Sequence, residues 1–212
     1  MGKIKVGILG GFRGKVGTVI GSTWRGEDII RALPRRGADN PTELQKLQRL
    51  KFKAVSEFLN PVRSTVSTYF GSEAGVKSRY NLATSYHLTN AVEVTGDTAE
   101  ILFNRVMISK GTLSGFQNIT ASHTGTEVTL QWEDNSLMNN AKAEDMVNAV
   151  FYSPDLKAFF VYENVAARAD LTAVVTLPTN LAGTAVEAYA FLYSGASKIS
   201  ANSVYLGSLE LT

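Results

Sequence analysis

Seven glycines and three basic residues fall within the segment GILGGFRGKVGTVIGSTWRG, residues 7–26, whose residue types could bind a phosphate group. The segment follows a short apolar run, and Gly11, Gly14 and Gly17 recur at three-residue intervals. At the turn between a strand and a helix, glycines let the backbone approach a pyrophosphate, and the amides of the helix N-terminus bind it. The chemistry to consider first is therefore nucleotide binding.

The sequence around this segment does not complete a nucleotide-binding unit. The GxGxxG pattern requires a glycine where Leu9 stands, and a P-loop requires Ser or Thr after a Gly-Lys pair, which Gly14-Lys15 lacks. The helix that should follow would contain Gly21 and Gly26, each about 1 kcal/mol less favourable than Ala. No second apolar strand ending in an acid follows. We therefore expect no nucleotide cofactor and no small-molecule substrate.

The other side chains capable of acid–base or metal chemistry form no recognisable catalytic set. Cysteine is absent, which excludes disulfides, zinc-thiolate sites and thiol catalysis. His87 and His123 have no neighbouring Ser and Asp pattern that requires a general base. The acidic pairs Glu133-Asp134 and Glu144-Asp145 lack the spacing of a calcium loop and are expected to be solvated. The sequence therefore predicts a protein that is not an enzyme and has no cofactor or bound metal.

Charge is distributed unevenly along the chain. Residues 1–53 contain twelve Lys and Arg against four Asp and Glu, a balance of +8, whereas residues 54–212 contain nine against fifteen, a balance of −6. A basic segment on an acidic body is typical of nucleic-acid binding, or of head-to-tail contact between copies of one chain. No run of eighteen apolar residues occurs, so we expect no membrane span.

The basic residues that could contact an anionic partner are concentrated in the first quarter of the chain. Basic side chains bind phosphate groups without reading sequence. A purely solubilising tail would not need apolar residues such as Val19, Ile20 and Ile29, which indicate that this region docks on a surface. The candidates for assembly or nucleic-acid contact are Arg13, Lys15, Trp24, Arg25, Arg31, Arg35, Arg36, Lys46, Arg49 and Lys53.

The first two of three regions along the chain are a basic segment and a helical one. Residues 1–39 are rich in glycine and predict an extended basic N-terminal arm. Residues 40–95 predict helices, because Asn40-Pro41-Thr42-Glu43 combines an N-cap, a proline at the first helical position and an acid in the first turn. Apolar residues then recur at helical spacing, at Leu44, Leu47, Ala54, Val55 and Phe58.

The third region, residues 96–212, has the pattern of an all-β domain. Short segments such as TEVTLQWE and TAVEAYAFLYS are rich in Val, Thr and aromatic residues, and turn signals separate them. Seven or eight such strands is the number found in an immunoglobulin-like sandwich, and Trp132 is expected in its core. The sequence therefore predicts an α+β protein in which a basic extended arm and helices precede an immunoglobulin-like β-sandwich.

Several segments together resemble a family of uncharacterised proteins of about this length, encoded in Bacteroidota genomes and in their phages or prophages. The segments are GKVGTVIGSTWRG, IIRALPRR, QRLKFKAV, RVMISKGTL, VTLQWEDNS and NSVYLGSLEL, which cover nearly the whole chain. The family has no assigned activity, so no residue role transfers from it. The resemblance implies a setting in which a structural protein present in many copies is plausible.

Two functional hypotheses follow. The first is a non-enzymatic structural assembly protein, a capsid-type subunit of a bacteriophage virion that forms homo-oligomers through its N-terminal arm and contacts the packaged genome. The second is a monomeric bacterial module in the cytoplasm that uses the basic arm to bind nucleic acid or an anionic surface. The oligomeric state of the purified protein distinguishes them.

Overall fold

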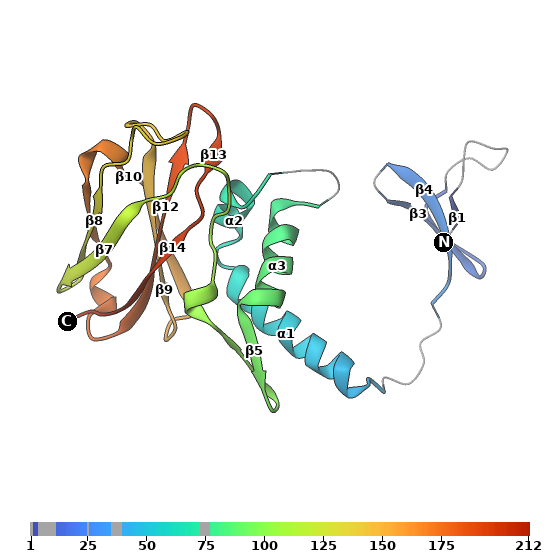
Figure 1. The fold of residues 1–212 in the computed structure, drawn as a ribbon. Coiled ribbons are helices and arrows are strands. Elements are labelled where there is room, and N and C mark those ends of the chain that lie inside the picture. Colours follow the sequence, from blue (N-terminus) through green and yellow to red (C-terminus); the bar gives the residue numbers. More distant parts are fainter. Residues whose placement is uncertain (1, 4–11, 25, 35–39, 73–76) are drawn as a thin grey trace. The chain divides into compact units, whose positions relative to one another are not determined.

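The computed structural model describes residues 2–3, 12–24, 26–34, 40–72 and 77–212 of the chain. It contains two compact units, Met1–Thr42 and Glu43–Thr212, which are called the N-terminal and C-terminal units below. The fold is α+β: a small N-terminal sheet is followed by three helices and then by several antiparallel sheets (Figure 1).

The N-terminal unit is a four-stranded antiparallel sheet with the strand order β1-β4-β3-β2. Its strands are β1 (Gly2–Lys3), β2 (Gly14–Val16), β3 (Val19–Trp24) and β4 (Glu27–Ala32). The prediction of an extended arm over residues 1–39 is therefore wrong for these strands. The reason lies in the glycines: Gly17, with φ 57°, begins the two-residue turn that joins β2 to β3. A glycine with positive φ at this turn position matches the twist of a hairpin.

A close approach of the backbone explains a second glycine of this sheet. A Cβ atom at Gly21 would overlap the carbonyl oxygen and the ring of Phe12. Gly21 is buried and pairs with Ile30 of β4. The glycine-rich composition thus permits turns and close packing within a sheet.

Three helices lie in the region for which helices were predicted. They are α1 (Glu43–Leu59), α2 (Arg63–Tyr69) and α3 (Arg79–Asn90). Pro61 separates α1 from α2, as expected for a residue that cannot continue a helix. At the start of α3, the Ser78 side chain accepts a hydrogen bond from the Asn81 N–H and so caps the helix.

The strands of the C-terminal unit form a hairpin and two larger antiparallel sheets. The hairpin joins β5 (Val92–Thr95) to β6 (Thr98–Ile101). The three-stranded sheet has the order β11-β8-β7, from β7 (Gln117–Thr124), β8 (Glu127–Glu133) and β11 (Thr172–Thr176). The five-stranded sheet consists of β9 (Met146–Ser153), β10 (Ala158–Ala167), β12 (Ala185–Ser194), β13 (Ile199–Ser200) and β14 (Val204–Glu210). Strand β9 lies between β10 and β12, and β12 also pairs with β13 and β14. The 3-10 helices are η1 (Phe103–Arg105), η2 (Arg168–Asp170) and η3 (Thr179–Leu181).

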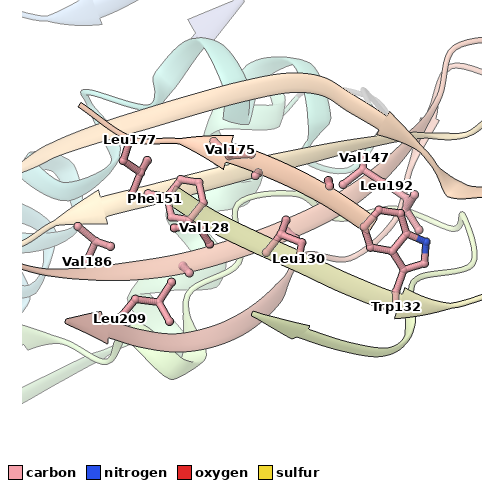
Figure 2. Packing of buried hydrophobic residues seen from close by; sticks show 14 of the residues in the cluster. Val128, Leu130, Trp132, Val147, Phe151, Val175, Leu177, Val186, Leu192 and Leu209 are labelled. Carbon is pink, nitrogen blue, oxygen red and sulfur yellow. The ribbon is translucent and has the colours of Figure 1, made fainter. Parts of the chain in front are cut away.

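The five-stranded sheet is apolar on both faces. One face shares a core with the three-stranded sheet, where Phe151 of β9, Leu192 of β12 and Trp132 of β8 belong to one hydrophobic cluster (Figure 2). Tyr189 and Phe191, the intervening residues of β12, point to the other face and pack in a second core with the helices. The alternation in β12 thus separates two buried faces, and the helices and strands form one unit.

Candidate functional site

The strand register brings two cations into one row on the N-terminal sheet. Lys15 of β2 lies opposite Ile20 of β3, and Ile20 lies opposite Arg31 of β4. Trp24 is four residues beyond Ile20 on the same strand, and therefore projects from the same face. Its side chain is 48% exposed. We call Lys15, Ile20, Trp24 and Arg31 the basic sheet face.

Arg13 makes its contacts on the other face of this sheet. Its Nε donates a hydrogen bond to Thr23 Oγ1 over 3.2 Å, and the Thr23 hydroxyl donates to Asp28 Oδ1 over 3.0 Å. Thr23 is adjacent to Trp24 in β3, so the two side chains project to opposite faces. The structure therefore separates Arg13 from Lys15 and Arg31.

The other predicted basic residues lie on α1 or outside the described part of the chain. Lys46 and Lys53 are exposed and lie 2.8 Å from Glu43 and 4.0 Å from Glu57 on the same helix. Such surface pairs contribute little to stability. Arg49 is also exposed on α1. The candidates outside the described residues are Arg25, Arg35 and Arg36.

The apolar face predicted for α1 is buried only in its second half. Val55 and Phe58 belong to the core beneath the helices. Leu44 is 78% exposed and Phe52 is 53% exposed, and Leu47 is exposed as well. We call residues 43–53 the exposed half of α1. It combines apolar side chains with the basic stripe formed by Lys46, Arg49 and Lys53.

Exposed apolar side chains are concentrated in the part of the chain that carries the basic sheet face and the exposed half of α1. Of the eleven large hydrophobic residues that are exposed among those described, six fall between residues 16 and 52: Val16, Trp24, Leu33, Leu44, Leu47 and Phe52. Scattered exposed hydrophobics are normal, whereas their concentration marks an interaction surface. The basic charge and the exposed apolar surface therefore coincide in the same part of the chain.

The structure places the two histidines in different surroundings. His87 is fully buried in α3, where Nδ1–H donates to the Ala83 carbonyl over 2.8 Å and Nε2 accepts the Met107 N–H over 3.3 Å. Burial lowers the pKa of His87, so the ring is neutral. His123 is partly buried, and its Nδ1 has no hydrogen-bond partner among the described atoms. Through its hydrogen bonds to Ala83 and Met107, His87 links α3 to the segment before β7.

The two acidic pairs are only partly solvated. Asp134 accepts a hydrogen bond from the Ser136 N–H, which lowers the pKa of its carboxyl group, and Glu133 accepts one from Gln117. Asp145, which was expected to be solvated, is instead buried in an ion pair with Arg168. Across the described residues, no group of three or more His, Asp and Glu is arranged to hold a metal ion.

A cavity of about 450 Å³ in the C-terminal unit has no counterpart among the features predicted from the sequence. It lies between the end of α2, the start of α3 and the β12–β13 hairpin, and is bordered by Arg79, Lys110 and Lys198. No motif links these residues, because they come from three distant segments. Only the fold brings them together.

No helix in the described part of the chain has the length and apolar character needed to cross a membrane.

Comparison with known proteins identifies a family. No curated protein matches the chain. Residues 11–207, which include every strand from β2 to β13, match the sequence profile of DUF6266, described as a family of unknown function. The chain therefore belongs to the DUF6266 family.

Proposed function

We propose that this chain is a non-enzymatic assembly protein whose copies bind one another through the basic sheet face and the exposed half of α1. The observation that carries the proposal is the concentration of exposed apolar side chains in residues 16–52, the part of the chain that carries both surfaces, with Trp24 on the sheet face and Leu44, Leu47 and Phe52 on α1. Burying Trp24, Leu44 and Phe52 against a neighbour removes apolar surface from water, at about 25 cal/mol per Å². The partner in this proposal is a second copy of the chain.

The distribution of charge supports contact between copies. Residues 1–53 have a balance of +8 and residues 54–212 a balance of −6. The basic part of one copy and the acidic body of the next are therefore electrostatically complementary, which raises the rate of association. Charge pairs at the rim of such an interface are screened by salt, so assembly should weaken at high ionic strength.

The proposal includes a biological setting, a capsid-type subunit of a bacteriophage virion. In that setting the three-stranded and five-stranded sheets act as the shell unit, an immunoglobulin-like sandwich. The core shared by these two antiparallel sheets supports this part of the proposal. The resemblance to proteins of Bacteroidota and their phages supports the setting. The N-terminal unit then links neighbours or faces the packaged genome.

The test compares two substitutions of exposed leucines in the full chain. Leu44 lies in the exposed half of α1, and Leu137, 98% exposed, lies in a turn of the C-terminal unit. Analytical ultracentrifugation of the wild type over micromolar concentrations should show association that decreases from about 0.1 to about 1 M NaCl. Leu44→Asp should dissociate the assembly, whereas Leu137→Asp should sediment as the wild type does. A wild-type protein that is monomeric throughout would contradict the proposal.

A second candidate function is a monomeric nucleic-acid-binding module, favoured by one observation. The exposed indole of Trp24 lies on the same sheet face as Lys15 and Arg31. Aromatic rings beside cations stack on the bases of single strands, and the cations bind the phosphates. A monomer that binds single-stranded DNA with a steep salt dependence, lost in Trp24→Ala, would favour this function over assembly.

A further inference from the structure

We propose that the cavity between α2, α3 and the β12–β13 hairpin binds a small organic anion, in which a phosphate or carboxylate group is attached to an apolar body. The cavity has a volume of about 450 Å³, within the range of sites for small ligands. It lies wholly in the C-terminal unit and involves neither the basic sheet face nor the exposed half of α1. The inference is therefore independent of the proposed assembly function.

Hydrogen bonds hold the walls of the cavity together. The Gly71 N–H donates to the Lys110 carbonyl over 2.6 Å, and the Lys110 N–H donates to the Tyr69 carbonyl over 3.1 Å. The Ser200 hydroxyl donates to the same Tyr69 carbonyl over 2.6 Å. These bonds join the end of α2, the segment before β7 and β13. The cavity is thus formed before a ligand arrives, which reduces the entropic cost of binding.

Gly111 lets two of these walls approach closely. A Cβ atom at this position would overlap the carbonyl oxygen of Ser200. The Gly111 N–H donates to Asn202 Oδ1 over 3.1 Å, and the Leu113 N–H donates to the Ser200 carbonyl over 3.1 Å. The backbone at the base of the cavity is therefore closely packed and hydrogen-bonded.

The charge around the cavity indicates an anionic ligand. Arg79, Lys110 and Lys198 line it, and its described lining residues include no carboxylate. This contrasts with the C-terminal unit as a whole, where residues 43–212 contain thirteen Lys and Arg and sixteen Asp and Glu. Among the residues that the structure describes, none of the three cations forms an ion pair with a carboxylate. Within the described part of the chain, these three charges are therefore left for a ligand.

Two of these cations are oriented by the walls. A guanidinium N–H of Arg79 donates to the Thr68 carbonyl, which leaves its other N–H groups to bind an anion. The Lys110 Nζ lies 5.5 Å from the centre of the Tyr86 ring, a cation–π distance. The Tyr69 ring lies 5.0 Å from that of Tyr193, and burial, followed by the nearby Glu163 carboxylate, raises the pKa of Tyr69 to about 12.

The remaining lining explains why the ligand needs an apolar body. Leu82, Tyr86, Tyr193 and Ile199 contribute apolar surface, and hydroxyl groups such as that of Thr68 add polar contacts. Inorganic phosphate would leave this apolar surface in contact with water. A long polyanion would need cations along a groove, whereas these border a single cavity. A ring or short chain carrying one anionic group satisfies both parts of the site.

The experiment titrates the full chain with phenyl phosphate, benzoate, inorganic phosphate and phenol, followed by calorimetry and NMR. We expect one saturable site for phenyl phosphate or benzoate, with an affinity at least about tenfold higher than for inorganic phosphate or phenol. The anion that binds more tightly identifies the acidic group. Absence of saturable binding by both phenyl phosphate and benzoate would overturn the inference.

Two exposed lysines provide a matched pair of variants. Lys198 lines the cavity and has a φ of 54°, and Lys157, in the turn of the β9–β10 hairpin, has a φ of 50°. Glutamine at either position therefore meets the same backbone conformation. Lys198→Gln should weaken binding about tenfold, the loss of one charge-assisted hydrogen bond, and Lys157→Gln should leave the affinity unchanged. Equal losses in the two variants would mean binding elsewhere and would also overturn the inference.

Discussion

Arg168 and Asp145 form an ion pair that is completely buried, with Arg168 Nη2 3.0 Å from Asp145 Oδ2. The guanidinium also donates to the Asn135 side chain over 2.6 Å and to the Ser114 carbonyl over 2.8 Å. It thereby fastens the segment before β7 and the segment after β8 to the start of β9. A buried charge that loses its partner is strongly unfavourable, because neither water nor another charge compensates it.

We therefore expect Asp145→Asn to lower the free energy of unfolding by about 3–5 kcal/mol. Urea denaturation followed by circular dichroism measures this change. The control is Lys142→Gln, which removes the exposed pair between Lys142 and Glu144, 3.7 Å apart. It should change stability little, because surface pairs are solvated and screened. Similar effects of the two substitutions would show that the buried pair is not required for stability.

The buried histidine makes stability depend on pH. The pKa of His87 in the folded protein is below its ordinary value of 6.5, because burial disfavours the charged ring. As the pH falls below about 6.5, the unfolded chain binds a proton at His87 before the folded chain does. The contribution of His87 to stability is therefore fully present above this pH and is lost progressively as the pH falls through the folded pKa.

The His87→Gln variant tests this relationship. We expect it to lose about 1–3 kcal/mol of stability at about pH 7.5, because the Met107 N–H loses its partner. Between about pH 7.5 and about pH 5.5 its stability should fall less than that of the wild type. Thr89→Ala removes an exposed hydrogen bond to Ser85 on the same helix and should keep the wild-type pH dependence. Parallel stability profiles for the wild type and His87→Gln would refute this account.

A tyrosine supports a buried carboxylate in the five-stranded sheet. The Tyr205 hydroxyl donates to Glu187 Oε2 over 2.5 Å, and Glu187 is 7% exposed. Burial and this hydrogen bond raise the pKa of Tyr205 to about 12. Tyr205→Phe should lower the free energy of unfolding by about 1–3 kcal/mol, since the carboxylate loses its donor without regaining water. Tyr162→Phe removes a solvent-exposed bond to the Thr176 carbonyl and should cost less in the same denaturation assay.

The close approach at Gly111 makes a further stability prediction. Gly111→Ala forces a Cβ atom against the Ser200 backbone and should lower stability by about 1–3 kcal/mol. A Cβ atom added at Gly195 would meet no other atom within 4 Å, and this glycine does not have a positive φ. Gly195→Ala should therefore be neutral, or stabilising by up to about 1 kcal/mol. Thermal melts of both variants measure these changes in stability. If Gly111→Ala has no effect on the melting temperature, the walls of the cavity separate easily.

Local signals in the sequence identified some elements correctly. The signals at Asn40–Glu43 predicted a helix that begins at Pro41, two residues before the start of α1 at Glu43, and Trp132 is in the core as expected. The N-terminal sheet was missed because its glycines were interpreted as an extended chain, although Gly17 supplies a hairpin turn. The two buried faces of β12 were missed because alternation along a strand does not reveal what covers each face.

The candidate site was also predictable from the sequence only in part. The basic residues were recognisable from the sequence, but their placement depends on strand register, which puts Lys15 and Arg31 in one row and Arg13 on the other face. Exposure of Leu44 depends on how much of α1 packs on the core, which buries only Val55, Phe58 and Leu59 of this helix. The cavity was unpredictable because Arg79, Lys110 and Lys198 are distant in sequence. Long-range pairing, rather than local propensity, determines each of these features.

The aromatic face of the five-stranded sheet also determines when the chain can fold during synthesis. The helices leave the ribosome first, but Tyr189 and Phe191, which they cover, belong to β12 near the other end of the sequence. Leu209 and Leu211 complete the opposite core later still. The apolar sides of α1 and α2 therefore lack these partners until β12 has been translated. We expect such delayed closure to expose apolar surface of the nascent chain to chaperones and to make folding slow relative to that of a helical bundle of this size.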